Sequence, residues 1–196
     1  MSVVFSNIKA QEAADRVLSL EVDETDKVAV GKLRQSIINV ANNIRTAIAD
    51  GRIKDPSDEL ISTLRSMDVE AMRLQFSTRF DGDTKHPPLL GSDVDNEVMF
   101  AVAEACAVLG LSAPKGFTGN MFRCWGFMMG LVRQVNEVKK IGTGGFLALA
   151  KAEHLQGSAE YIVYHKAKEH GEVVTKHLGK GCMERIEEVL KEHGAI

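Results

Sequence analysis

Apolar residues along the chain recur mainly at spacings of three and four, the period of an amphipathic α-helix. The clearest case is a seam of six apolar positions between residues 30 and 47, which spans about five helical turns. No stretch alternates apolar and polar residues in the way that predicts a half-buried β-strand. The pattern therefore predicts an all-α fold. The seam consists of Val30, Leu33, Ile37, Val40, Ile44 and Ala47.

Polar residues and glycines mark the expected ends of the helices. The polar cluster at residues 23–25 can cap the helix that carries the seam, and Gly51 can end it. Asp55 is expected to cap the next helix, with Pro56 in its first turn. These signals place two long helices in the first 80 residues.

The later part of the chain predicts several more helices. One uninterrupted apolar helix is expected from residue 121 to about 140, another over residues 158–178, and a last one over residues 182–192. Gly126 and Gly130 lie four residues apart, which indicates a close contact between helices. We expect six to eight helices in a single compact domain over residues 1–196, in which an arm of roughly residues 1–25 could be flexible or pack separately.

Composition places the chain among ordinary globular proteins. Of its 196 residues 44% are hydrophobic and 26% are charged, enough to bury a core without disulfides. Its three cysteines, Cys106, Cys124 and Cys182, are far apart and odd in number, which favours reduced thiols. Neither a signal peptide nor a run long enough to cross a bilayer is evident. We therefore expect a soluble, cytoplasmic protein with no membrane partner.

No motif of the sequence indicates catalysis, a cofactor or a metal. A phosphate-binding glycine loop, a nucleophile elbow and the zinc and calcium signatures are all missing. His165 and Glu169 are spaced like chelating residues on a helix, yet no third ligand has suitable spacing, so a solvated helix face is the preferred interpretation. We expect no cofactor and no metal, and lean against an enzyme, although distant residues could still assemble an active site.

Charged residues are unevenly distributed along the chain, and this is its most informative feature. Residues 1–120 carry 13 Lys and Arg against 18 Asp and Glu, whereas residues 121–185 carry 10 against 6. This basic segment also holds aromatic residues that could stack on bases, although solvated lysines and core aromatics would explain the same pattern. They include Trp125, Phe127, Phe146, Tyr161 and Tyr164.

The basic segment favours a structural protein that assembles with itself and coats single-stranded nucleic acid, in the manner of viral coat or nucleocapsid proteins. Such a protein would lie in the virion, and its positive charges would follow the phosphates without sequence preference. The apolar seam could supply a contact between copies, although burial in its own core is the simpler interpretation. The expected nucleic-acid-binding residues are Arg123, Arg133, Lys139, Lys140 and Lys151.

A second hypothesis is a soluble helical ligand-binding domain, or a small enzyme, with a pocket beneath residues 80–96. Two prolines and two glycines make this the longest expected loop, and long loops are often functional. Its polar residues could converge on a ligand. They are Asp81, Asp83, His86 and Asp93.

Overall fold

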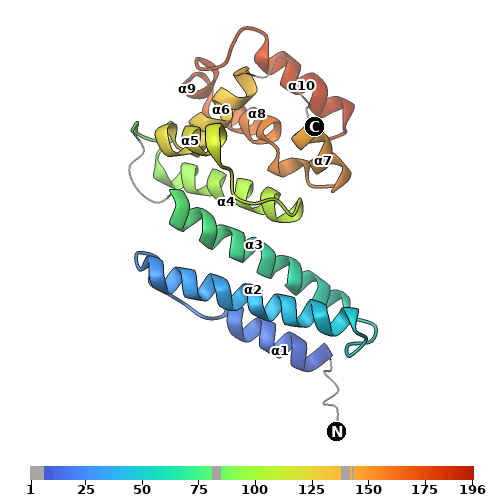
Figure 1. Cartoon of the computed structure of the whole chain (residues 1–196). Helices are drawn as coiled ribbons and strands as arrows, with labels where there is room; N and C mark the ends of the chain where they lie inside the picture. The colour runs from blue at the N-terminus through green and yellow to red at the C-terminus, as the bar shows by residue number, and fades with distance from the viewer. Residues whose placement is uncertain (1–6, 81–84, 138–141, 143) are drawn as a thin grey trace. The chain divides into compact units, whose positions relative to one another are not determined.

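The structure, a computed structural model, describes residues 7–80, 85–137, 142 and 144–196. These residues form ten α-helices and one short 3-10 helix, and they include no strand. The all-α prediction is confirmed for this part of the chain, while the count of six to eight helices is too low. The chain divides into two compact units, Met1–Asp81 and Gly82–Ile196 (Figure 1). That residues 1–196 behave as one domain stays a prediction.

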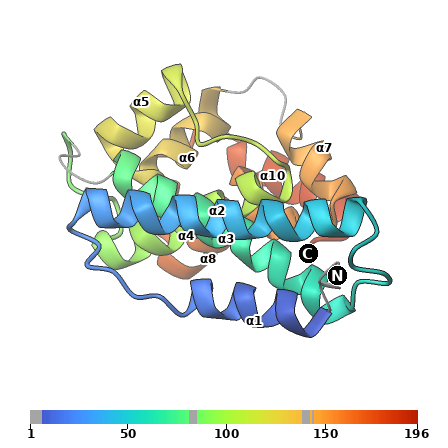
Figure 2. The same ribbon diagram turned by 60° about the horizontal axis from the view of Figure 1, so that its bottom comes forward.

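The first unit is a bundle of three helices, each of which contacts the other two (Figure 2). The seam of α2 lies inside this bundle: five of its six residues are buried, and Val40 is half-buried. Burial in its own core is therefore confirmed for the seam, which is not an open surface for assembly. The helices are α1 (Asn7–Leu18), α2 (Lys27–Ala49) and α3 (Asp58–Phe80).

Side-chain oxygens cap α2 and α3 one to three residues later than expected. The Asp26 carboxylate accepts hydrogen bonds from the backbone N–H groups of Val28 and Ala29 at 2.9 and 3.0 Å, so Asp26 caps α2. The Ser57 hydroxyl accepts one from Leu60 N at 3.2 Å. Ser57 therefore caps α3, and the prediction of an Asp55 cap is wrong, because Asp55 takes a positive φ of 51° ahead of the helix.

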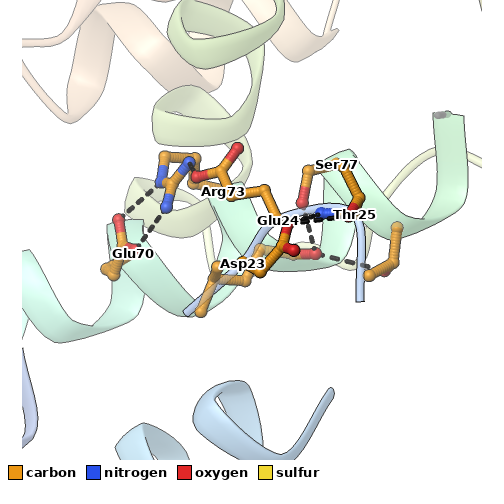
Figure 3. Close-up of polar contacts among 8 residues, drawn as sticks. Asp23, Glu24, Thr25, Glu70, Arg73 and Ser77 are labelled. Atoms are coloured by element: carbon orange, nitrogen blue, oxygen red, sulfur yellow. Dashed lines mark hydrogen bonds and ion pairs between the residues drawn. The ribbon is translucent and has the colours of Figure 1, made fainter. Parts of the chain in front are cut away.

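An arginine on α3 fixes the loop between α1 and α2 (Figure 3). Arg73 donates to Glu24 of that loop at 2.7 Å, and through Nε and Nη2 to both carboxylate oxygens of Glu70 at 2.7 and 2.8 Å. Asp23 accepts from the Thr25 backbone and hydroxyl at 2.9 and 2.7 Å. The bonds to Glu70 raise the pKa of Arg73 further above its usual range. The ion pair between Arg73 and Glu24 therefore holds the loop against α3.

The second unit is built around α6 and α8, which contact each other. Helix α6 also contacts α4 and α5, and α8 contacts α9, α10 and the 3-10 helix η1. None of the helices that the structure describes is both long and apolar enough to cross a bilayer. The elements are α4 (Ser92–Val108), α5 (Gly116–Trp125), α6 (Phe127–Glu137), α7 (Gly144–Lys151), η1 (Leu155–Gly157), α8 (Ala159–His170), α9 (Glu172–Thr175) and α10 (Cys182–Glu192).

The helix expected over residues 121–140 is broken at Gly126, which takes a φ of 76°. The buried carboxylate of Asp95 on α4 caps the new helix, accepting from Phe127 N at 2.9 Å and Met128 N at 2.8 Å. Burial raises the pKa of Asp95, against the lowering effect of these two bonds. The prediction of one uninterrupted helix is wrong, because this cap comes from a distant segment.

Both glycines make room for a side chain of another helix, and a Cβ atom at Gly126 would lie 2.8 Å from Oδ2 of Asp95 on α4. A Cβ atom at Gly130 would lie 2.5 Å from the ring of Phe122, so α6 approaches α5 closely at that position. The helix expected over residues 158–178 also ends early, at Gly171, whose φ is 54°. Its start is as expected, since the Ser158 hydroxyl caps α8 by accepting from Tyr161 N at 3.1 Å.

Candidate functional site

One side of α5 presents cationic, aromatic and amide groups to the solvent. Phe117, Asn120 and Arg123 follow one another at a spacing of three, which places them on one side of the helix, and Lys115 directly precedes it. All four residues are exposed, and Phe117 is 67% exposed. The Arg123 guanidinium donates to the Asn120 side-chain oxygen at 3.1 Å. We call these four residues the α5 face.

The α5 face combines groups that recognise a charged, planar ligand. A guanidinium and an ammonium neutralise phosphates, and an aromatic ring offers a surface on which a base can stack. Single exposed apolar residues are common on protein surfaces, and Ile8 and Val28 are about as exposed as Phe117. What distinguishes Phe117 is that its ring lies on the same side of α5 as the guanidinium of Arg123.

The structure places the predicted nucleic-acid-binding residues on separate elements. Arg123 belongs to the α5 face, and Lys151 is the exposed last residue of α7. Figures 1 and 2 both show α5 and α7 on different sides of the second unit. Lys139 and Lys140 lie outside the described residues. The structure therefore does not gather the described members of this set on one helix face.

Arg133 is engaged by an aromatic ring of the protein itself. It lies half-buried on α6, with its guanidinium carbon 3.9 Å from the ring centroid of Trp125. The imidazole of His86 stacks on the same indole, with ring centroids 3.8 Å apart and planes inclined by 6°. These contacts hold Trp125 in place within the unit, so its ring is less available for bases than the sequence pattern indicates.

The aromatic residues of the basic segment are mostly structural. Phe127 and Phe146 are buried, as the alternative of core aromatics predicts, and Tyr161 and Tyr164 are half-buried, each in contact with the ring of His165. Phe117, four residues before the basic segment begins, is strongly exposed, and sequence reasoning missed it. In the sequence, Phe117 lies between Gly116 and Thr118 and outside any periodic apolar run, and this position could have indicated that its side chain is exposed.

One of the positive charges on α8, that of Lys166, is paired with carboxylates of the protein. Lys166 contacts Glu97 of α4 at 3.0 Å and Glu169 at 3.1 Å. Glu169, whose spacing from His165 resembles a chelating pair, is thus bound to a lysine. The described residues contain no group of three or more His, Cys, Asp or Glu side chains that could hold a metal ion.

The second unit also contains a cavity of about 230 Å³. Side chains of α4, α5, α6, α7 and α8, together with η1, line it, and none of the described residues between 80 and 96 is part of its lining. The predicted site beneath that loop is not this cavity: His86 stacks on Trp125, Asp93 is exposed, and Asp81 and Asp83 lie outside the described residues.

The cavity is mostly apolar, with a few polar groups at its wall. Glu160 is only 9% exposed and accepts a hydrogen bond from Gly142 N at 3.3 Å. Thr118, Gln134 and Ser158 also line the cavity. Burial raises the pKa of Cys106, another lining residue, to about 11. Its thiol therefore stays protonated at neutral pH and is a poor nucleophile.

Comparisons of this chain with protein-family models, with curated proteins and with solved structures give no significant match. Its function therefore has to be inferred from its own residues.

Proposed function

We propose that this protein is a non-catalytic structural protein that assembles with copies of itself and coats single-stranded nucleic acid. The observation that carries the proposal is the α5 face, where an exposed aromatic ring stands beside exposed cationic side chains. Proteins that bind single strands without sequence preference combine these two elements, because every base has a face for stacking and every nucleotide has a phosphate.

The basic segment extends the proposed path of the nucleic acid beyond α5. Residues 121–185 belong entirely to the second unit and carry four more positive than negative charges. In this proposal Arg123, Arg133 and Lys151, together with Lys139 and Lys140, neutralise phosphates, while Phe117 stacks on a base. Such contacts bind any sequence, as a coat must.

Self-assembly follows in this proposal from the division of charge along the chain. Residues 1–120 carry five more negative than positive charges, and the basic segment carries the opposite sign. The acidic part of one copy therefore attracts the basic part of another, and head-to-tail contacts of this kind build rings or filaments. Bound nucleic acid would then run along the assembly.

The test is binding of a fluorescent single-stranded RNA, measured by anisotropy over a range of salt concentrations. Arg123→Glu should weaken binding at least tenfold, since it removes a phosphate contact and adds a repulsive charge. It should also reduce the salt slope, that is, the steepness with which log affinity falls as log salt concentration rises, by about one or more. Phe117→Ala should weaken binding by about 1–3 kcal/mol with little change in the slope, because stacking releases no counterions. Lys32→Glu, an exposed change of the same charge on α2, is the matched control.

Light scattering on a sizing column, with absorbance at 260 and 280 nm before and after nuclease, tests assembly. The proposal expects large particles that absorb strongly at 260 nm and shrink with nuclease. Unchanged RNA affinity and salt slope in both α5 variants would overturn the role of the α5 face. A monomer free of nucleic acid, with no affinity for added RNA, would overturn the whole proposal.

The alternative of a helical ligand-binding domain is favoured by a single observation, the cavity of the second unit. Its location differs from the one expected beneath residues 80–96.

A further inference from the structure

The size of the cavity in the second unit limits what it can hold. Its volume is about 230 Å³. A cavity of about 150 Å³ with apolar walls holds one benzene molecule, so this one has room for roughly nine non-hydrogen atoms. That is the size of a small aromatic or branched aliphatic molecule, and smaller than a nucleotide.

The walls of the cavity favour an apolar body. The apolar wall comes from α5, α6, α7 and the residue that directly follows α4, and it surrounds the space with hydrocarbon; it includes Leu109, Phe122, Leu131, Phe146 and Leu149. Transfer of an apolar molecule from water into such a space is favourable in proportion to the area removed from water. These walls alone would accept any molecule of suitable size.

One charged group gives the cavity its selectivity. Glu160, the second residue of α8, lines the cavity and is almost fully buried. Among the described residues, its carboxylate accepts one long hydrogen bond, from Gly142 N at 3.3 Å, and forms no ion pair. A buried carboxylate with so few partners among the described residues gains from a positively charged donor placed next to it.

Two further polar groups of the wall are available to the same donor. Gln134 and Thr118 line the cavity, and their side chains make no hydrogen bond to another described residue. Each offers an oxygen acceptor. An ammonium group carries three N–H donors and no acceptor. A wall with one carboxylate and neutral oxygen acceptors therefore binds an ammonium group better than a neutral or an anionic group.

We propose that this cavity is a binding site for a small primary amine, with an apolar body of roughly nine non-hydrogen atoms and its ammonium group on the Glu160 carboxylate. The site is separate from the α5 face and does not depend on nucleic-acid binding. A phosphate or carboxylate is excluded, because it would lie against the buried charge of Glu160.

Three probes of matched shape test the proposal on the full-length protein: 2-phenylethylamine, 2-phenylethanol and phenylacetate. Titration calorimetry and amide chemical-shift changes report their binding. We expect the amine to bind at least tenfold more tightly than the alcohol, and phenylacetate to bind more weakly than both. Glu160→Gln should remove the preference for the amine, while Glu188→Gln, an exposed change of the same charge on α10, should keep it.

A variant that fills the cavity separates this site from the surface. Thr118 is half-buried, so Thr118→Phe can place its ring in the cavity with little disturbance of the core, and it should abolish binding of the amine and the alcohol alike. RNA affinity should be the same for Glu160→Gln and the unchanged protein. Equal affinity for all three probes, amine binding that survives Glu160→Gln, or no binding of any probe would each overturn the proposal.

Discussion

At the scale of single residues, the backbone of Gly126 and the carboxylate of Asp95 depend on each other. Gly126 turns the chain with a φ of 76°, and a Cβ atom there would lie 2.8 Å from the Asp95 side-chain oxygen Oδ2. That oxygen and its neighbour accept the first two N–H groups of α6. The absence of a side chain at Gly126 thus serves both the turn and the cap.

Gly126→Ala should therefore be more costly than an ordinary glycine substitution. A φ of 76° with a ψ of 175° is a conformation that only glycine adopts readily and costs an alanine about 1–3 kcal/mol, and displacement of Asp95 leaves buried N–H groups unsatisfied at about 1–3 kcal/mol each. Gly91→Ala is the matched control, since Gly91 has a similar φ of 87° and ψ of 166° and no atom within 4 Å of its would-be Cβ. Urea unfolding should show a loss for Gly126→Ala at least about twice that of the control; equal losses would contradict the role of Asp95.

At the scale of helices, the N-terminus of α2 rests on one side chain. Asp26→Ala removes both hydrogen bonds that the carboxylate accepts and should lower the free energy of unfolding by about 1 kcal/mol. Asp26→Ser restores a capping oxygen and should recover most of the loss. Thermal and urea unfolding measure both variants. An alanine variant as stable as the serine variant would show that the loop contacts of Arg73 hold this end of α2 without the cap.

Local signals in the sequence predict the bounds of a helix correctly where the residues that begin and end the helix lie within or next to it. The last helix was expected over residues 182–192, and α10 spans those residues. Ser158 was expected to start α8 and does so. The break at Gly126 could not be foreseen in this way, because its cap lies 31 residues earlier, on α4. A hydrophobic period shows that a segment is helical but not whether a distant carboxylate will interrupt it.

The candidate site shows the same limit. Charge along the chain indicated Arg123, which is exposed on α5. It could not separate Phe117, which is exposed, from Phe127 and Phe146, which are buried, because exposure depends on how the helices pack. The cavity is lined from six elements between residues 102 and 160, and no sequence spacing brings those residues together.

At the scale of the whole molecule, each unit has a core of its own. In the first unit the core lies among α1, α2 and α3, and Leu60 is one of its fully buried residues. Each unit therefore has the means to be a separate cooperative unit in unfolding. This bears directly on the expectation of one domain over residues 1–196.

Leu60→Ala should distinguish two cooperative units from one. The substitution should cost about 2–5 kcal/mol, because it leaves a cavity in a packed core. If the units unfold separately, as we predict, native-state hydrogen exchange should show that loss of protection in α2 and α3, while the slowest amides of α6 and α8 keep theirs. An equal loss across both units would establish a single domain instead.

The pairing of Asp95 with Gly126 also has a consequence for the descent of this protein. A lineage that replaced Gly126 would lose the space that the carboxylate needs, and one that replaced Asp95 would leave the start of α6 without its cap. Neither change is tolerated well alone, so the two positions should be inherited together. An acidic residue followed 31 positions later by a glycine, between two apolar helical segments, is thus a signature by which distant descendants can be recognised after overall similarity has been lost.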